Sequence, residues 1–472
     1  MKLTHLNLKW SIITLGLLAG CARFQPHPIS PAQSAAALDA RTLDNPAFKE
    51  FLEKNLRHQF GEWPPKSWDF ETLTLAALYY HPSLEVARAQ WQGTEGGIVT
   101  AAQMPNPTLT AAPGYSANPT GTTPWLPGVS FDLPIETMGK RGYRKARAQH
   151  LSESARLNIA VTAWQVRSNL RASLLDFVAA RRRESLLQQQ VSVQQQIVQS
   201  LQERFDAGAV SSSELGLVKI ALARSQLDLA DARRLSADAR VRVADAIGVP
   251  VKALAGTELV YELSAGHPAA AELMSAEIRG WALQNRADIL GALADYASSQ
   301  SALQLEIAKQ YPDIHIGPGY QFDEGDHKFT LALTAELPIL NQNQGLIAEA
   351  EAHRVESAAR FIAMQAKVIA EIDRAVASYR VTEENLVTLE SLAATQKKQS
   401  EGVEAQVKAG AADRLDLLNS QIELGATALV ELDGQVRVQQ AFGALEDAVQ
   451  RPIEAMASAL QQHAQAMKEN KK

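Results

Sequence analysis

The segment Phe205-Asp206-Ala207-Gly208-Ala209-Val210 separates two long stretches in which mostly apolar residues recur at coiled-coil spacing. Before the segment, the positions alternately four and three residues apart are Leu187, Val191, Gln194, Val198, Leu201 and Phe205. After it, the same spacing continues through Leu215, Val218, Leu222, Ser225, Leu229, Ala232, Ser236, Ala239 and Val243. Narrow seams of this kind are typical of helices packed lengthwise rather than around a globular core. We therefore predict a helical hairpin from Gly139 to Pro250, with an outgoing arm that spans roughly 100 Å.

The order of elements around this hairpin occurs a second time, at an offset of about 203 residues. The matched segments are Pro107-Thr108-Leu109 with Pro312-Asp313-Ile314, Leu133-Pro134-Ile135 with Leu337-Pro338-Ile339, Ala207-Gly208-Ala209 with Ala409-Gly410-Ala411, and Pro250 with Pro452. Four matches in the same order indicate a tandem duplication. We predict that residues 67–250 and 271–452 each form a helix, two strands and a long helical hairpin, with a short mixed segment at 251–270 between them.

Two stretches of each repeat read as strands. Val129, Phe131, Leu133 and Ile135 alternate with more polar positions, and the same alternation runs from Lys328 to Ile339. Their partners are expected around 108–115 and 314–322. Strict alternation over about ten residues is typical of a membrane β-strand, with one face to lipid and one to water. A half-buried strand of a soluble sheet alternates in the same way, so the alternation alone leaves both interpretations open.

Counting the strands predicts the oligomeric state. Four strands cannot close a barrel, and open sheet edges are not tolerated in lipid. Two copies would give eight strands, which enclose only side chains, whereas three copies would give twelve and leave room for a lumen. We therefore predict a homotrimer with a mainly α fold and a membrane β-barrel part, to which each chain contributes two strand pairs and two helical hairpins.

The N-terminus carries a targeting signal. Lys2 and Lys9 precede a short apolar segment, Trp10 to Leu18, and Leu18-Ala19-Gly20-Cys21 is similar to a lipobox. The apolar segment is too short to span a bilayer. We predict a signal peptide at 1–20, a covalent lipid on Cys21, and a lipid-anchored tether at 21–66. An ordinary secretory peptide that happens to end in cysteine is the alternative. Cys21 is the only cysteine in the chain, so no disulfide framework is expected.

The composition limits the possible partners. The chain holds 52 acidic and 46 basic residues and has a net charge of −6, which argues against a nucleic-acid partner. At its end, residues 453–472 read as a polar helical tail. We expect this tail and the inter-repeat segment to pack together midway along the helical body.

No catalytic constellation is recognisable in the sequence. The repeat counterpart of His81 is Arg286, so we expect His81 to cap a helix or lie on the surface. The loop Asp323-Glu324-Gly325-Asp326-His327 fits neither a zinc site nor an EF-hand and reads as a solvated loop. Gly139-Lys140 lacks the remaining residues of a phosphate-binding loop. We therefore predict that the chain is not an enzyme, and we expect no metal site and no cofactor beyond the lipid.

With the duplicated hairpins, the paired strands and the lipobox together, the chain resembles the TolC-like outer-membrane factor family. The resemblance covers about Asp69 to Pro452. Its most specific motif is Arg204-Phe205-Asp206-Ala207-Gly208-Ala209 with Glu214-Leu215, and the stretches 134–142 and 338–345 resemble the heavy-metal, cobalt–zinc–cadmium branch. The resemblance implies a trimer with a twelve-stranded outer-membrane barrel continuous with a periplasmic α-helical tunnel. It also implies two partners, a periplasmic adaptor (membrane fusion) protein and an inner-membrane pump of the RND type.

The resemblance further assigns two functional regions. The adaptor-docking hairpin tips map onto Phe205, Ala207, Gly208 and Ala209, and onto Val407, Ala409, Gly410 and Ala411. A ring that narrows the periplasmic entrance maps onto Asp416, with Asp413 nearby. A second acidic position of the family is Asn419 here, which puts a double ring in doubt. The simpler alternative is that Asp413 and Asp416 only stabilise a helix N-terminus.

The expected function is a passive outer-membrane duct of a tripartite efflux system that exports heavy-metal cations. A drug-efflux or type I secretion channel shares the same architecture and is the alternative within transport. A lipid-anchored coiled-coil tether without a pore is the alternative from another class, but it would have no use for the alternating strands.

Overall fold

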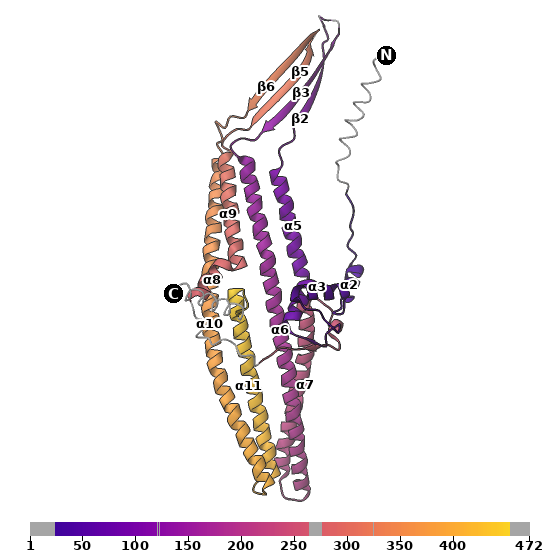
Figure 1. Cartoon of the computed structure of the whole chain (residues 1–472), viewed down its shortest axis with the longest axis vertical. Helices are drawn as coiled ribbons and strands as arrows, with labels where there is room; N and C mark the ends of the chain where they lie inside the picture. Colours follow the sequence, from indigo (N-terminus) through magenta and orange to yellow (C-terminus); the bar gives the residue numbers. More distant parts are fainter. Residues whose placement is uncertain (1–23, 120, 122, 264–275, 324, 454–472) are drawn as a thin grey trace. The chain divides into compact units, whose positions relative to one another are not determined.

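The computed structural model describes residues 24–119, 121, 123–263, 276–323 and 325–453 (Figure 1). The chain divides into two compact units at Thr42. Within its described residues, the N-terminal unit contains one short helix, α2 (Pro31–Asp39), which is capped by Ser30 and has no buried residue. Cys21 and residues 1–23 as a whole lie outside the described residues, and so does the predicted tail after Ile453.

The second unit, from Leu43 onward, contains the predicted duplication. The first repeat comprises α4 (Phe70–Tyr80), α5 (Pro82–Ala102), β2 (Thr108–Tyr115), β3 (Trp125–Ile135), α6 (Lys140–Asp206) and α7 (Ser212–Ile247). The second comprises α8 (Ala276–Asn285), α9 (Ala287–Ala308), β5 (Ile314–Asp323), β6 (Asp326–Ala335), α10 (Gln344–Lys408) and α11 (Arg414–Val449). The mainly α fold with two long helical hairpins and four strands is therefore confirmed.

The two repeats form one lengthwise body within this unit. Figure 1 shows the strands at one end, the turns of both hairpins at the other, and the helices running between them. The outgoing helices α6 and α10 have 67 and 65 residues, and both return helices have 36. At 1.5 Å per residue, each outgoing helix is about 100 Å long. The four strands form one antiparallel sheet in the order β2-β3-β5-β6.

Short polar motifs set the ends of the helices. Asp69 caps α4 by accepting a hydrogen bond from the Thr72 amide at 2.9 Å. Pro82 then begins a new helix, and His81 caps α5 through its Nδ1, which accepts from the Ser83 amide at 3.3 Å. The expected capping role of His81 is thus observed. Its repeat counterpart Arg286 stands at the same position before α9, but there the side chain is buried against carboxylates.

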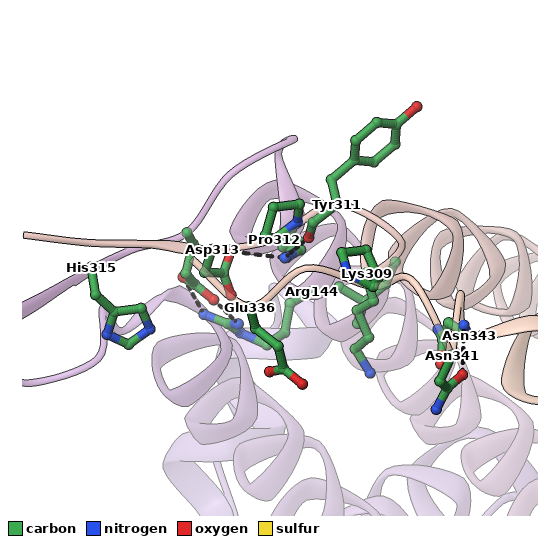
Figure 2. A pocket seen from close by; sticks show the side chains of 13 residues that line it. Arg144, Lys309, Tyr311, Pro312, Asp313, His315, Glu336, Asn341 and Asn343 are labelled. Atoms are coloured by element: carbon green, nitrogen blue, oxygen red, sulfur yellow. Dashed lines mark hydrogen bonds and ion pairs between the residues drawn. The ribbon is translucent and has the colours of Figure 1, made fainter. Parts of the chain in front are cut away.

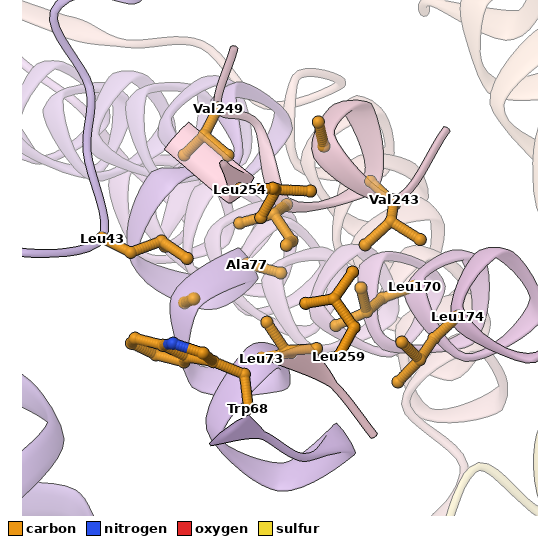
Figure 3. Close-up of a cluster of buried hydrophobic side chains, with 14 of the residues drawn as sticks. Leu43, Trp68, Leu73, Ala77, Leu170, Leu174, Val243, Val249, Leu254 and Leu259 are labelled. Atoms are coloured by element: carbon orange, nitrogen blue, oxygen red, sulfur yellow. The ribbon is translucent and has the colours of Figure 1, made fainter. Parts of the chain in front are cut away.

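The cores lie midway along the body rather than at its ends. In the first repeat, Figure 3 shows Trp68 and Leu73 gathered with residues of α6, α7 and the inter-repeat segment. The ring of Trp68 also stacks on the ring of Phe48, with the ring centroids 6.1 Å apart. A second cluster around Tyr379 and Phe442 occupies the equivalent place in the second repeat. The buried Tyr379 hydroxyl has its pKa raised to about 12, because burial disfavours the phenolate.

Two details of the sequence prediction need correction. The tether was expected to reach residue 66, but α3 (Pro46–Leu56) buries Phe48 and Leu52 completely in the first core. The inter-repeat segment contains the short helix η1 (Val251–Leu254) and the strand β4 (Glu258–Leu259), which pairs in parallel with β1 (Ser67–Trp68). The expected packing of this segment against the tail lies outside the described residues. Finally, β6 ends at Ala335, although the alternation in the sequence continues to Ile339.

A buried ionic cluster fastens α6 of the first repeat to α11 of the second. The Arg171 guanidinium donates to Glu446 Oε2 at 2.6 Å, to Asp447 Oδ2 at 2.7 Å and to the Gly443 carbonyl at 2.6 Å. A Cβ on Gly443 would lie only 2.6 Å from Arg171 Nε, so glycine is needed for this close approach. Because Arg171 and Glu446 are both buried, their charges need these partners for compensation, and Arg167 is a second partner of Glu446 at 3.0 Å.

We predict that R171M destabilises the folded protein by on the order of 3 kcal/mol, because the buried Glu446 carboxylate loses its main partner. The matched control is R156M, which removes an exposed ion pair between Arg156 and Glu153 on the same helix and should cost less than about 0.5 kcal/mol. Denaturant unfolding of the purified proteins in detergent, followed by circular dichroism, measures both. Equal stability of the two variants would contradict the assigned role of Arg171.

Candidate functional site

The four-stranded sheet has two chemically different faces. On one face the register aligns Leu109, Ala111, Pro113, Tyr115, Trp125, Pro127, Val129, Phe131, Leu133, Ile135, Ile314, Ile316, Pro318, Tyr320, Phe322, His327, Phe329, Leu331, Leu333 and Ala335. The other face carries Thr108, Thr110, Ser130, Asp132, His315, Gln321, Lys328, Thr330 and Thr334, interspersed with small residues. Residues of one face alternate with those of the other along every strand. One face is therefore suited to hydrocarbon and the other to water.

Neither face is covered by other described residues. All residues of the four strands are exposed or half-buried, and Phe329 on the apolar face is 81% exposed. The alternative of a soluble sheet, half-buried on a core, does not describe this chain. The strands have 8 to 11 residues, close to the about 9–11 that a tilted membrane strand needs. Among the described helices, none combines the length and the apolar character required to cross a membrane.

A polar junction joins the sheet to the helices (Figure 2). The ammonium of Lys140, in the first turn of α6, donates to Asp313 Oδ1 at 2.8 Å and to the Tyr311 carbonyl at 2.6 Å. The Thr137 amide also donates to Asp313, at 2.9 Å. Burial alone would raise the pKa of the Asp313 carboxyl, but these hydrogen bonds outweigh it and hold the pKa below its usual value. Asp313 therefore stays ionised and ties the second repeat to the first.

The helix starts at this junction are related by the duplication. Gly139 and Asn343 precede α6 and α10 in the left-handed conformation, with φ of 72° and 64°. Asn343 tolerates this conformation and donates from its side chain to the Glu306 carbonyl at 2.8 Å and to Glu306 Oε2 at 3.0 Å. Burial would raise the pKa of Glu306, but the hydrogen bonds from Lys309 and Asn343 lower it overall. Between the two helix starts lies a pocket of about 660 Å³.

At the opposite end, the two hairpin tips have the predicted glycine turns. Gly208 and Gly410 have φ of 72° and 74°, and the amide after each returns to a carbonyl of the preceding helix at 2.8 Å. A residue with a side chain would be strained in this conformation. The predicted tip residues Phe205, Ala207, Gly208, Ala209, Ala409, Gly410 and Ala411 are exposed, and Val407 is half-buried. The tips thus present small residues and one phenylalanine to whatever lies beyond them.

The predicted entrance residues take part in local structure. Asp413 is the N-cap of α11, and the Asp416 carboxylate accepts from the Asp413 amide at 2.9 Å, which completes a capping box. Asp413 also forms an ion pair with Arg204 near the tip of the other hairpin, and this hydrogen bond lowers the pKa of the Asp413 carboxyl. The helix-capping alternative is therefore observed for both residues.

The two hairpins meet along a groove just above the tips. It has a volume of about 420 Å³, and Asp416 and Asn419 line it together with several glutamines of the outgoing helices. Beside it, Ile197, Leu201, Leu215 and Leu418 form a buried cluster drawn from both hairpins. The seam predicted from the 3-4 spacing therefore joins the hairpins to each other as well as joining the arms within each one.

The sequence analysis missed the junction, although a signal for it exists. In the aligned repeats, Asp313 corresponds to Thr108, and Lys140 corresponds to Gln344. The two copies thus differ in charge at two positions, with opposite signs, and the structure brings these positions together. The described residues contain no group of three or more histidine, cysteine, aspartate or glutamate side chains arranged to hold a metal ion.

A long helical body that ends in a sheet with an uncovered apolar face defines the class of outer-membrane channels. The chain belongs to the outer membrane efflux protein family, whose family model matches residues 74–249 and 279–450, which cover most of both repeats. It is 25% identical over 265 residues to the cobalt-zinc-cadmium resistance protein CzcC of Cupriavidus metallidurans. That match covers 56% of this chain and 61% of the relative, less than two thirds of the relative's length.

Solved structures share the fold. The outer membrane protein VceC from Vibrio cholerae aligns with a TM-score of 0.66 and 17% identity, over 80% of this chain and 95% of VceC. The transmembrane channel CusC aligns with a TM-score of 0.65 and 17% identity, over 83% and 95%. The outer-membrane channel OprN aligns with a TM-score of 0.68 and 15% identity, over 91% and 98%. The chain therefore has the fold of these outer-membrane channels along nearly their whole length.

The tip glycines permit a sharp prediction. G208A should destabilise the protein by about 1 kcal/mol, because an alanine is strained at positive φ. G216A, in the neighbouring helix α7 with open space around the added methyl, should instead stabilise it by about 0.5–1 kcal/mol. Thermal unfolding of the two variants in detergent gives the comparison. A stabilised G208A protein would show that the tip does not need glycine for its backbone conformation.

Proposed function

We propose that three copies of this chain form an outer-membrane channel of a tripartite efflux system, through which heavy-metal cations leave the cell. The observation that carries the proposal is the sheet, with a bare apolar face, a polar opposite face and two open edges. Among the described strands, β2 and β6 each have one neighbour, β3 and β5 respectively. In lipid, the unpaired backbone groups of these edges must find partners.

Pairing between copies satisfies this requirement. If β6 of each copy pairs with β2 of the next, three copies supply twelve strands and close a barrel wide enough for a lumen. The apolar face then turns outward to lipid, and the polar face, with Asp132, His315 and Lys328, lines the lumen. The helical hairpins continue the same ring into the periplasm as a tunnel. Its length of about 100 Å suits a duct that crosses much of that compartment.

The free end of the tunnel supplies the contact with partners. The exposed small residues of the two tips, around Gly208 and Gly410, offer close approach for helices of a periplasmic adaptor protein. An inner-membrane pump of the RND type would then provide the energy, while this chain acts as a passive duct. At the entrance, Asp416 and Asp413 of three copies would form an acidic ring. Because like charges on one axis repel, such a ring favours cations.

The likeness to the cobalt-zinc-cadmium resistance protein favours heavy-metal cations as the cargo. The carboxylates on the polar face and at the hairpin ends agree with a cationic cargo. A drug-efflux or type I secretion channel remains the alternative within transport, because the fold is shared by channels of several kinds. A pore-free tether is the weaker alternative, because it gives the two-faced sheet no role.

The export proposal predicts the phenotype of a deletion strain. Without the gene, tolerance to zinc, cobalt and cadmium should fall several-fold, while tolerance to a panel of drugs should stay unchanged. Growth assays with and without a plasmid carrying the wild-type gene measure this. Loss of drug tolerance alone would instead support the drug-efflux alternative. A purified protein that never conducts in a planar bilayer would support the tether.

A lipid on Cys21 is the second part of the proposal, supported by the lipobox at 18–21. The wild-type protein should incorporate labelled palmitate and show a diacylglyceryl and acyl mass increase on its N-terminal peptide. C21S should show neither, because serine offers no thiol for the thioether. Unlabelled wild-type protein, or cleavage at another residue, would contradict the assignment.

A further inference from the structure

The lower end of the polar face holds a histidine in an unusual environment. His315, on β5, lies opposite Pro134 of β3 on one side and Thr334 of β6 on the other. Its Nδ1 is 2.9 Å from Asp132 Oδ2 and 3.1 Å from Asp132 Oδ1. Both side chains belong to the face that the proposed trimer turns toward the lumen. His315 is therefore a lumenal residue, fixed by a carboxylate on the neighbouring strand.

The carboxylate determines which ring nitrogen stays available. An ionised aspartate can only accept hydrogen bonds, so the proton of a neutral His315 ring resides on Nδ1. The lone pair then lies on Nε2, which is the state in which imidazole binds a metal. A carboxylate that fixes the tautomer and orientation of a histidine in this way is the usual companion of a metal-binding histidine. Asp132 and His315 are 46% and 39% exposed, so solutes have access to the pair.

A second donor lines the same pocket as His315. Glu336 follows β6 directly and is two residues beyond Thr334, the cross-strand partner of His315. Glu336 and His315 both line the junction pocket of about 660 Å³, and Figure 2 shows both side chains on its wall. The other two carboxylates of the pocket are occupied, Glu136 by Arg144 and Asp313 by Lys140. The Glu336 side chain forms no ion pair or hydrogen bond within the described residues.

We propose that His315 Nε2 and the Glu336 carboxylate form a transient binding site for a divalent transition-metal ion such as Zn²⁺ or Co²⁺, with Asp132 as the positioning residue. This proposal deepens the function proposed above, on which it rests, by naming a place in the lumen where the cargo pauses. Imidazole together with a carboxylate suits Zn²⁺ and Co²⁺, whereas Mg²⁺ prefers oxygen ligands alone. Water molecules supply the remaining ligands.

A site with two protein ligands binds a metal ion weakly, and weak binding is what a channel requires of a site along its path. Conduction requires an ion to bind well enough to enter and weakly enough to leave. In the proposed trimer, three such sites would lie at one level of the barrel, just above the start of the helical tunnel.

The experiment uses the full-length protein in a planar bilayer. Millimolar Zn²⁺ should reduce the current through wild-type channels more strongly than the same concentration of Mg²⁺. In H315A the current reduction by Zn²⁺ should fall to the level seen with Mg²⁺, and D132N should need a 10- to 100-fold higher Zn²⁺ concentration. The matched control is H327A, because His327 belongs to the apolar face, and its Zn²⁺ response should equal that of the wild type.

A second measurement separates this inference from the channel proposal. Visible absorption of Co²⁺ added to the detergent-solubilised full-length protein should show a ligand-field band that H315A and E336Q weaken and H327A leaves intact. A protein that conducts but shows equal responses to Zn²⁺ and Mg²⁺, or a Co²⁺ band unchanged in H315A, would overturn the site. A protein that does not conduct would overturn the channel proposal, while the Co²⁺ band still decides the site.

Discussion

The structure depends on one constraint, that backbone N–H and C=O groups cannot remain unpaired in hydrocarbon. The sheet of this chain satisfies its two inner strands and leaves β2 and β6 each with a bare edge. Its apolar face has no cover from the part of the chain that the structure describes. A single copy therefore cannot be the form that meets lipid. Because these edges must be paired, the strands require an oligomer. The helices of that oligomer would then enclose the tunnel.

The duplication explains most of the architecture, and the differences between the copies fasten it together. The two repeats match in helix lengths, in the glycine turns and in the left-handed residues before α6 and α10. At three places where they differ in charge, they contact each other. Lys140 of the first repeat meets Asp313 of the second, and Arg171 of the first meets Glu446 of the second. Arg204 and Asp413 do the same near the tips. Ion pairs between charged residues that differ between the two repeats thus hold the repeats together.

Much of this could be predicted from the sequence, because its main signals are periodic. The 3-4 seams gave the hairpins, the alternation gave the strands, and the tip glycines followed from the need for positive φ. Contacts between segments far apart in the chain could not be read in this way. The β1–β4 pair, the burial of Phe48 and Leu52, and the Lys140–Asp313 pair all depend on how the two repeats fold against each other. A helix-capping role for Asp413 and Asp416 was recognisable, but no local pattern told whether it was their only role.

The most direct test is disulfide cross-linking between copies, since Cys21 is the only native cysteine. One cysteine is placed on β2, at Thr110, and a second is moved along β6 through Thr330, Ala332 and Thr334 in separate variants of the full-length protein. After oxidation in the outer membrane, the account predicts that at least one register gives a band at the mass of three chains and nothing larger. Only single chains in every register, or a ladder that continues past three, would contradict a closed barrel of three copies.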